Sequence, residues 1–326
     1  MMAAPHIAIL GRALAPQAMA LAEQAGARVT TTDTYLRGPD LDSFMQENNP
    51  DAIILRLGEV TDAAMALAPN LRIIAKHGVG YDTIDVDAAT RRNVLVTIAR
   101  GANAISVAEH ALALTLGVAR GIAYQDARIR SGHWDKAFFM GHELNGKVLG
   151  VVGLGAIGHA LARICAALGM DVLVYDPALP DGAAIELQRV GSLEGLLAQS
   201  DVVSLHCPLT AATRNMIDAQ RLNMMKPGAI LINTARGGLI DLEALADALE
   251  ARRIAGAGLD TFPVEPPQLT ERLRLLPNLV VSPHIGASTI EAGRRVGMMA
   301  MQQVLDHLAG RAVDRAVVVN RPPQAA

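Results

Sequence analysis

Short apolar runs alternate with helix-like segments along almost the whole chain, and this alternation limits the folds that the chain can adopt. The first five segments read as strand, helix, strand, helix and strand: Ile7–Leu10, Pro16–Ala25, Ala52–Leu57, Ala63–Ala68 and Leu71–Ala75. Strands separated by helices in this way predict an α/β fold built on a parallel sheet.

A second series of the same kind follows a long apolar helical pattern at Asn103–Arg120. Its predicted strands are Val148–Val152, Asp171–Tyr175, Val202–His206, Ile230–Asn233 and Val280–Ser282, and its predicted helices include Ile157–Leu168, Leu242–Glu250 and Thr289–Leu308. Glycines follow a strand in each series, at Gly78–Gly80 and at Gly153–Gly158. The repeated pattern predicts two doubly wound, Rossmann-like lobes.

The helix at 103–120 and the helix from residue 289 onward are predicted to cross between the lobes. We therefore expect a first lobe made of residues 1–101 and completed by residues 289–326, with the second lobe, residues 102–288, inserted into it. A length of 326 residues agrees with two lobes, because single hydrophobic cores rarely grow beyond about 250 residues.

Composition narrows the class of protein. Apolar residues make up 51% of the chain and aromatic residues only 3%, as suits parallel strands covered on both faces by helices. A net charge of −3 gives no indication of a nucleic-acid or membrane-surface binder, and no run of about 20 apolar residues predicts a membrane span. Cys165 and Cys207 are too few for a disulfide framework and lack metal-ligand spacing. No basic segment precedes the first apolar run, so we expect a cytoplasmic protein without a metal site.

The glycines of the second series carry a more specific signal. The segment Gly153-Leu154-Gly155-Ala156-Ile157-Gly158 directly follows a predicted strand and opens a helix. The first glycine permits a tight turn, the second lets backbone approach a pyrophosphate, and the third allows the helix to pack on the strand. The helix N-terminus adds free amide groups and partial positive charge.

Asp176 ends the next predicted strand, at the position of an acid that binds ribose hydroxyls. Its carboxylate would repel a 2′-phosphate, and the residues after it supply no cation. The sequence therefore predicts a dinucleotide site that prefers NAD to NADP. The alternative is a structural turn followed by an ordinary strand-end acid.

Three further residues suit a reaction at such a site. Arg236 lies just past a predicted strand, where its guanidinium can hold a carboxylate with two bonds. His284 follows another strand, and imidazole suits proton transfer near neutral pH. Glu265 lies among three prolines, and a carboxylate paired with imidazolium raises the histidine pKa. Alone, each side chain has an ordinary structural alternative; together they predict hydride transfer between a nicotinamide and a small 2-keto acid.

These motifs resemble those of the D-isomer-specific 2-hydroxyacid dehydrogenases. The resemblance runs from about residue 50 to about residue 300, and its main blocks are Gly146–Gly158, Asn233–Ile240 and Ser282–Thr289. It implies that Arg236, Glu265 and His284 form the catalytic set, that NAD is the cofactor, and that the chain forms a homodimer through its nucleotide-binding lobe. Glutamate rather than glutamine at 265 argues against the formate dehydrogenase branch.

The resemblance also implies further contacts. The implied cofactor-binding residues are Gly153, Gly155, Ala156, Ile157, Gly158, Asp176, His206, Cys207, Pro208, Thr234, Ala235, Asp260 and Gly286. Among them, Asp260 is expected near the nicotinamide carboxamide, and Cys207 is expected to pack beside the cofactor. The implied substrate-binding residues are Arg56, His77, Gly78 and Val79.

Arg56 bears on the choice of substrate, because it resembles a phosphate contact of D-3-phosphoglycerate dehydrogenases. Its alternative role is a structural salt bridge at a strand end. Two other functions stay open: a reductase of hydroxypyruvate or glyoxylate, and a non-enzymatic NAD-sensing binding protein. Trp134 and Phe138–Met140 read as interface or core packing, with closure over the site as an alternative. His110, His133 and His142 show no ligand-like grouping.

Overall fold

The computed structural model describes residues 4–180 and 186–322. The chain divides into two compact units, residues 1–103 with 288–326 and residues 104–287. We call them unit 1 and unit 2. The divisions expected from the sequence fall after residues 101 and 288.

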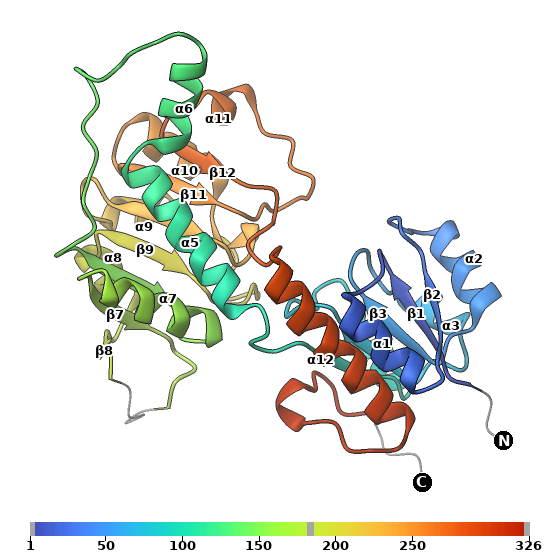
Figure 1. Ribbon diagram of the computed structural model, residues 1–326. Coiled ribbons are helices and arrows are strands. Elements are labelled where there is room, and N and C mark those ends of the chain that lie inside the picture. Colours follow the sequence, from blue (N-terminus) through green and yellow to red (C-terminus); the bar gives the residue numbers. More distant parts are fainter. Residues whose placement is uncertain (1–3, 181–185, 323–326) are drawn as a thin grey trace. The chain divides into compact units, whose positions relative to one another are not determined.

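Unit 1 is built on a five-stranded parallel sheet with strand order β2-β1-β3-β4-β5. Figure 1 labels β1, β2 and β3 of this sheet. Its strands are β1 (His6–Leu10), β2 (Arg28–Thr31), β3 (Ala52–Leu55), β4 (Ile73–Lys76) and β5 (Leu95–Ile98). Its helices are α1 (Pro16–Gln24), α2 (Pro39–Asn48), α3 (Asp62–Ala66), α4 (Val86–Arg91) and α12 (Ile290–Leu308), with a 3-10 turn η2 (Arg315–Val317).

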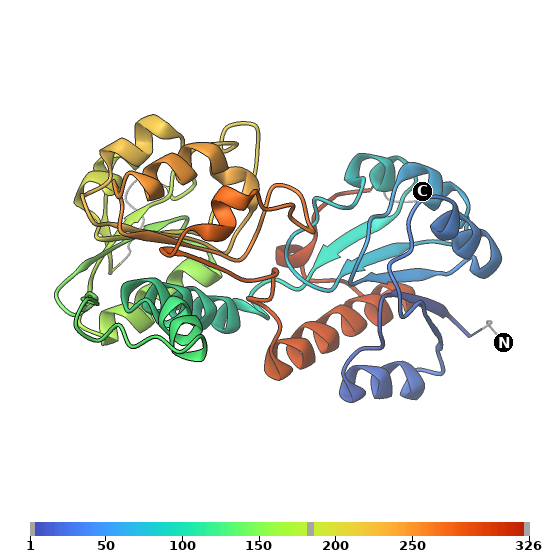
Figure 2. The same cartoon turned by 90° about the horizontal axis from the view of Figure 1, so that it is seen from above.

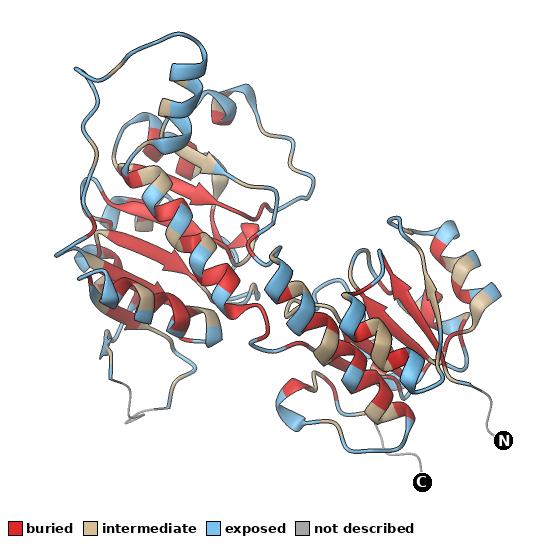
Figure 3. Cartoon of the chain, viewed as in Figure 1, coloured by how far each residue is buried: buried red, intermediate tan, exposed pale blue. Residues whose placement is uncertain are grey.

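Alternate side chains of the unit 1 strands enter two separate cores. Ile7 and Ile9 of β1 pack with α1 and α12 on one face of the sheet. Ala8 and Leu10 pack with α2, α3 and α4 on the other face. Because both faces are covered, residues 7–10 of β1 are a continuous apolar run and not an alternating one, and Figure 3 shows β1 as buried.

Unit 2 is built on a seven-stranded parallel sheet with strand order β12-β11-β10-β9-β6-β7-β8. Its strands are β6 (Val148–Val152), β7 (Asp171–Tyr175), β8 (Gln188–Arg189), β9 (Val202–Leu205), β10 (Ile230–Asn233), β11 (Gly256–Leu259) and β12 (Leu279–Val281). Its helices are α5 (Ala104–Ala119), α6 (Ile122–Arg130), α7 (Ala156–Ala167), α8 (Leu193–Gln199), α9 (Ala219–Met224), α10 (Leu242–Glu250) and α11 (Glu271–Leu275), with a 3-10 turn η1 (Gly237–Leu239).

Two layers of helices cover the unit 2 sheet. Helices α5 and α7 pack on one face, and α8, α9 and α10 pack on the other, as the edge-on view in Figure 2 shows. The chain starts at β6, builds outward to β8, and then returns to β9 on the other side of β6. Strand order therefore reverses between β6 and β9. In open α/β sheets, ligands bind at the carboxyl ends of the strands at such a reversal.

The predicted α/β fold with two doubly wound parallel sheets is confirmed. Predicted segments Val148–Val152, Asp171–Tyr175, Ile230–Asn233 and Leu242–Glu250 have the observed bounds. The strand predicted to reach residue 57 ends at Leu55, because the next two N–H groups both bond the carbonyl of Leu10, each at 3.1 Å, and the chain turns away.

Among the described residues, no single helix is long and apolar enough to cross a membrane. The pair α5 and α6 passes this test of length and composition only when both are taken together, and it is bent by 61°.

Candidate active site

The glycine turn after β6 lies at the reversal of strand order in unit 2. Gly153 has φ +95°, and a Cβ there would lie 2.9 Å from the backbone of residues 206 and 207 after β9. A Cβ at Gly158 would overlap the carbonyl oxygen of Gly153. Backbone conformation and close packing therefore require these two glycines.

Gly155 is different, because the protein itself does not require a glycine there. It is the N-cap of α7 with φ −75°, and an added Cβ would meet no heavy atom within 4 Å. A missing side chain in front of the helix N-terminus leaves room for an anionic ligand, as a pyrophosphate needs. Ala156 and Ile157 form the first turn of this helix.

Asp176 directly follows β7 and joins the glycine turn through hydrogen bonds. Its Oδ2 accepts the N–H of Leu154 at 2.8 Å, and its Oδ1 accepts the N–H of Ala178 at 2.9 Å. These bonds fix the carboxylate beside the turn. Each oxygen keeps a further lone pair that a ribose hydroxyl can use.

Three buried polar side-chain atoms at the same edge of the sheet lack a hydrogen-bond partner within the described part of the chain. They are Nδ1 of His206 after β9, Oγ1 of Thr234 after β10, and Oγ1 of Thr261 after β11. Buried polar atoms are rarely left unpaired in native proteins, so their clustering indicates a polar ligand. Pro208 continues the loop after β9, and Ala235 the loop after β10.

Two side chains after β9 are uncharged near neutral pH. Burial lowers the pKa of His206 to about 4, and its Nε2 lies 2.8 Å from Oγ of Ser204. Burial also raises the pKa of the Cys207 thiol to about 11, and its Sγ lies 3.7 Å from Sδ of Met216. A protonated, packed thiol supports a packing role for Cys207.

His284 and Glu265 form a direct pair. Nδ1 of His284 lies 2.7 Å from Oε2 of Glu265, with the two side chains 48% and 37% exposed. The other oxygen, Oε1, accepts the N–H of Phe262 at 3.0 Å. Burial opposes ionisation of Glu265, but the bonds from His284 and Phe262, with the positive charge of Arg236 nearby, outweigh it and lower the pKa. The peptide bond from Glu265 to Pro266 is cis.

The turn that carries Arg236 packs against the segment that carries Glu265. Nδ2 of Asn233 donates to the carbonyl of Arg236 at 2.8 Å, and Oδ1 of Asn233 accepts the N–H of Ala235 at 3.0 Å, so this asparagine shapes the turn. A Cβ at Gly237 would overlap the backbone of Phe262. The two segments thus approach as closely as their backbones allow.

Asp260 holds the backbone around His284. Its carbonyl accepts the N–H of His284 at 2.8 Å, while Oδ1 and Oδ2 accept the N–H groups of Ile285 at 2.9 Å and Gly286 at 2.8 Å. His284 itself has φ +53°, in the left-handed region. Such a conformation costs a non-glycine residue about 1–2 kcal/mol, which these bonds offset.

His110 and Ser282 also contact Asp260, and sequence reasoning missed both. Nε2 of His110 lies 2.8 Å from Oγ of Ser282 and 3.2 Å from Oδ1 of Asp260. The sequence shows no ligand-like grouping around His110, because the partners come from segments about 150 and 172 residues further along the chain. Only the packing of α5 on the sheet brings them together.

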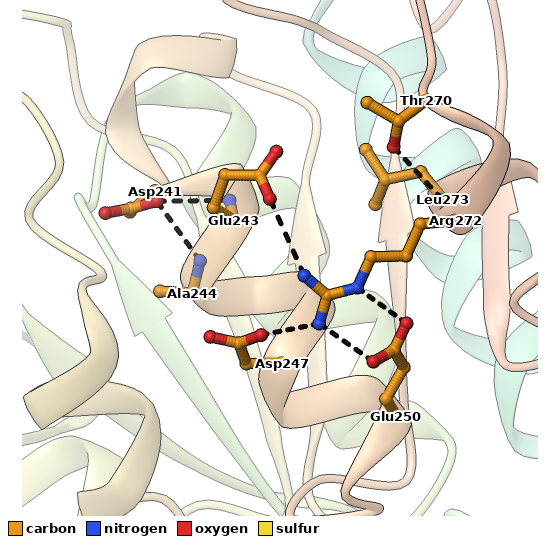
Figure 4. Close-up of polar contacts among 8 residues, drawn as sticks. All are labelled: Asp241, Glu243, Ala244, Asp247, Glu250, Thr270, Arg272 and Leu273. Carbon is orange, nitrogen blue, oxygen red and sulfur yellow. Dashed lines mark hydrogen bonds and ion pairs between the residues drawn. The ribbon is translucent and has the colours of Figure 1, made fainter.

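Arg272 fixes the far end of the segment that carries Glu265. As Figure 4 shows, its guanidinium reaches three acidic side chains of α10, with Nη2 2.5 Å from Asp247 and Nε 2.6 Å from Glu250. Thr270 caps α11 by accepting the N–H of Leu273 at 3.3 Å. The loop is thus tied to α10 at one end and to β11 at the other.

The residues predicted to bind substrate lie in unit 1, after β3 and β4. Nη1 of Arg56 donates to the carbonyls of Arg12 at 2.7 Å and Ala13 at 2.5 Å. Burial and the charge of Arg12 lower the pKa of Arg56. Burial, with the charges of Arg56 and Lys76 next, lowers the pKa of His77 to about 4. These contacts place cationic groups together, with Gly78 (φ +152°) and Val79 continuing the loop after His77.

Among residues 4–180 and 186–322, no group of three or more His, Cys, Asp or Glu side chains is arranged to hold a metal ion. The two doubly wound sheets, the glycine turn with its acid, and the histidine–glutamate pair define the class of two-domain, nucleotide-binding α/β proteins.

The chain belongs to the D-isomer specific 2-hydroxyacid dehydrogenase family. The model for the NAD binding domain of this family matches residues 112–286. A D-3-phosphoglycerate dehydrogenase of Mycobacterium tuberculosis is 43% identical over 317 residues, covering 96% of this chain and 59% of that protein. A hydroxypyruvate reductase of Thermotoga maritima is 42% identical over 280 residues, covering 85% of this chain and 90% of that protein.

The fold agrees with these sequence matches. A crystal structure of a Thermus thermophilus protein aligns with a TM-score of 0.87 and 34% identity, covering 96% of this chain and all of that one. The chain spans about 59% of the length of that phosphoglycerate dehydrogenase. The family resemblance inferred from the motifs is confirmed.

Proposed function

We propose that this chain is an NAD-dependent dehydrogenase that interconverts a small 2-keto acid and the matching 2-hydroxy acid. The observation that carries the proposal is the pair of His284 and Glu265 at 2.7 Å, on a segment packed against the turn of Arg236. In the same unit, the open space at Gly155 and the unpaired atoms after β9, β10 and β11 fit a dinucleotide.

In the proposed reaction, each of the three side chains has a distinct role. The bound nicotinamide supplies or accepts the hydride. Arg236 binds the substrate carboxylate and polarises the neighbouring keto group. His284 in its protonated form donates a proton to the carbonyl oxygen during reduction, and it takes the proton back during oxidation. Glu265 orients the imidazole and stabilises its positive charge.

Asp176 supports NAD as the cofactor over NADP. Its carboxylate is fixed beside the glycine turn by two backbone N–H groups, one on each oxygen. A 2′-phosphate at this position would meet a negative charge, whereas ribose hydroxyls can donate to it. The orphaned Nδ1 of His206 adds a polar atom on the neighbouring loop.

The cationic group of unit 1 supports a substrate with an anionic tail. Arg56 and Lys76 bring positive charge to His77, and Arg12 brings positive charge to Arg56. Arg56 bonds backbone carbonyls through Nη1, so its side chain is held in place by the segment after β1. We infer that 3-phosphoglycerate and its keto form are the leading substrate pair, with hydroxypyruvate and glyoxylate as alternatives.

We further propose a cytoplasmic homodimer that forms through unit 2. Helix α6 buries none of its residues, and large apolar side chains on it and after it are exposed. They include Ile122 (57%), Ile129 (52%), Trp134 (76%), Phe138 (91%) and Met140 (90%). Large exposed apolar side chains concentrated in one segment of the chain, residues 122–140, are typical of an interface between subunits. Reduced, unpaired Cys165 and Cys207 suit a reducing compartment.

NADH oxidation by the purified protein tests the proposed activity, with 3-phosphohydroxypyruvate, hydroxypyruvate, glyoxylate and pyruvate as substrates and NADPH in parallel. We expect turnover with NADH that His284→Ala abolishes almost completely, with highest kcat/KM for an acid with an anionic tail. NADH binding without turnover of any acid would refute the dehydrogenase and favour an NAD-sensing binding protein. Light scattering on the wild type and on Phe138→Ser tests the dimer, which the variant should weaken.

A further inference from the structure

We propose that His110 is a positioning residue of the reaction, acting through Ser282 and Asp260 on the backbone that carries His284. This inference rests on the proposed function for its effect on turnover. His110 lies on α5, and its side chain contacts Ser282 and Asp260.

The position of His110 is fixed by the close packing of α5 on β11. Leu114 lies four residues later on α5, so both side chains lie on the same face of the helix. A Cβ at Gly258 of β11 would lie 2.9 Å from Cβ of Leu114, so the helix and the strand are in direct contact there. One helical turn before this contact, His110 reaches Asp260, the first residue after β11.

The hydrogen bonds among His110, Ser282 and Asp260 determine which side chain donates to which. Ser282 has one hydroxyl proton and donates it to Oδ1 of Asp260 at 2.6 Å. Its oxygen therefore accepts from Nε2 of His110, 2.8 Å away, which must carry a hydrogen. This arrangement fixes the tautomer of His110. Oδ1 of Asp260 lies 2.6 Å from Oγ of Ser282 and 3.2 Å from Nε2 of His110.

Asp260 connects His110 and Ser282 to the backbone next to His284. Its side chain is only 2% exposed, and its carboxylate bonds the N–H groups of Ile285 and Gly286. A Cβ at Gly286 would lie 2.9 Å from Oδ2 of Asp260 and 3.5 Å from Cδ2 of His110, so the loop rests directly on both side chains. The left-handed conformation of His284 is held by the same contacts.

Loss of the imidazole should therefore displace His284 rather than weaken cofactor binding. A displacement of about 1 Å at a reacting group can lower the rate by about 10²-fold. We expect His110→Leu and Ser282→Ala each to lower kcat by roughly 10- to 100-fold, while the Kd for NADH stays within about twofold of the wild type. His110→Gln, which retains an N–H donor, should recover most of the lost kcat.

A double-mutant cycle separates this role from general destabilisation. His110 and Ser282 act through the same series of hydrogen bonds. The kcat of the variant with both His110→Leu and Ser282→Ala should therefore be no lower than that of the slower single variant. His142→Leu is the matched control, since His142 is an exposed histidine of the same unit. Multiplied losses in the double variant, or no recovery in His110→Gln, would overturn the proposal.

Hydrogen exchange of the 282–286 segment provides a readout that needs no turnover. We expect the amides of Ile285 and Gly286 to exchange roughly tenfold faster in His110→Leu and Ser282→Ala than in the wild type, but not in His110→Gln or His142→Leu. If the wild type reduces no acid, the proposed function fails, and this exchange pattern alone decides the role of His110. Unchanged exchange of the Ile285 and Gly286 amides in His110→Leu would refute the positioning role of His110.

Discussion

Replacing Gly155 with alanine should weaken NADH binding without unfolding the protein. The glycine has φ −75°, and an added Cβ meets no heavy atom within 4 Å, so the fold itself tolerates a methyl group. Gly155 is the N-cap of α7, and changes of side chain at an N-cap alter stability by about 1 kcal/mol. We therefore expect the free energy of unfolding to change by no more than about 1 kcal/mol.

The same methyl group would stand where we propose that the pyrophosphate lies. A hydrogen bond from a backbone N–H to a charged group contributes about 1.5–3 kcal/mol. Loss of one such bond should therefore weaken NADH binding by about 10- to 150-fold, since each 1.4 kcal/mol is about tenfold in Kd. Titration followed by NADH fluorescence measures Kd, and urea denaturation measures stability.

Gly158→Ala provides the contrast, because its Cβ would overlap the carbonyl of Gly153. That variant should lose stability whether or not NADH is present. An NADH affinity of Gly155→Ala within twofold of the wild type would refute the placement of the pyrophosphate.

Four further predictions follow from the site. His284→Ala should lower kcat by roughly 10²–10⁴-fold with unchanged Kd for NADH, and near-normal turnover would remove His284 from the mechanism. Because the pKa of Glu265 is lowered in the folded state, its contribution to stability is present above the ordinary glutamate pKa and is lost as pH falls through the folded value. The stability advantage of the wild type over Glu265→Gln in urea should therefore shrink from about pH 6 to about pH 3, and a constant difference would contradict this reasoning. Asp176→Asn should raise kcat/KM with NADPH relative to NADH, and an unchanged ratio would separate Asp176 from cofactor choice. Arg272→Met should lower the free energy of unfolding only slightly, since the acidic partners of Arg272 are largely exposed, and a loss that persists in about 1 M salt would point to packing instead.

Local sequence was sufficient for the signals that depend on neighbours along the chain. Strands such as Val148–Val152 are covered on both faces and therefore read as apolar runs with turn residues beside them. The glycine turn and Asp176 lie within one strand–helix–strand segment, so their spacing carries the prediction. Arg236, Glu265 and His284 each follow a strand or lie in a proline-rich loop, and each was predicted from its own motif.

Other parts of the fold carry a weaker local pattern. Strand β11 (Gly256–Leu259) contains two glycines, because α5 and neighbouring side chains press against it, and it was not predicted from the sequence. Helix α6 buries no residue, so it has no apolar face toward a core to reveal it. The formation of both elements depends on the segments that pack against them, and the local sequence pattern does not reveal those contacts.

The sequence by itself determined the fold class, the family and the residue types available for the reaction. Tertiary structure decided which of those residues meet. The contact of His284 with Glu265 spans 19 residues, and that of His110 with Ser282 spans 172. The register of α5 on the sheet and the return of each strand to a common edge set these distances. Because a hydrogen bond forms only when its atoms approach within about 3 Å, packing decides between a histidine that is merely present and one that holds a carboxylate.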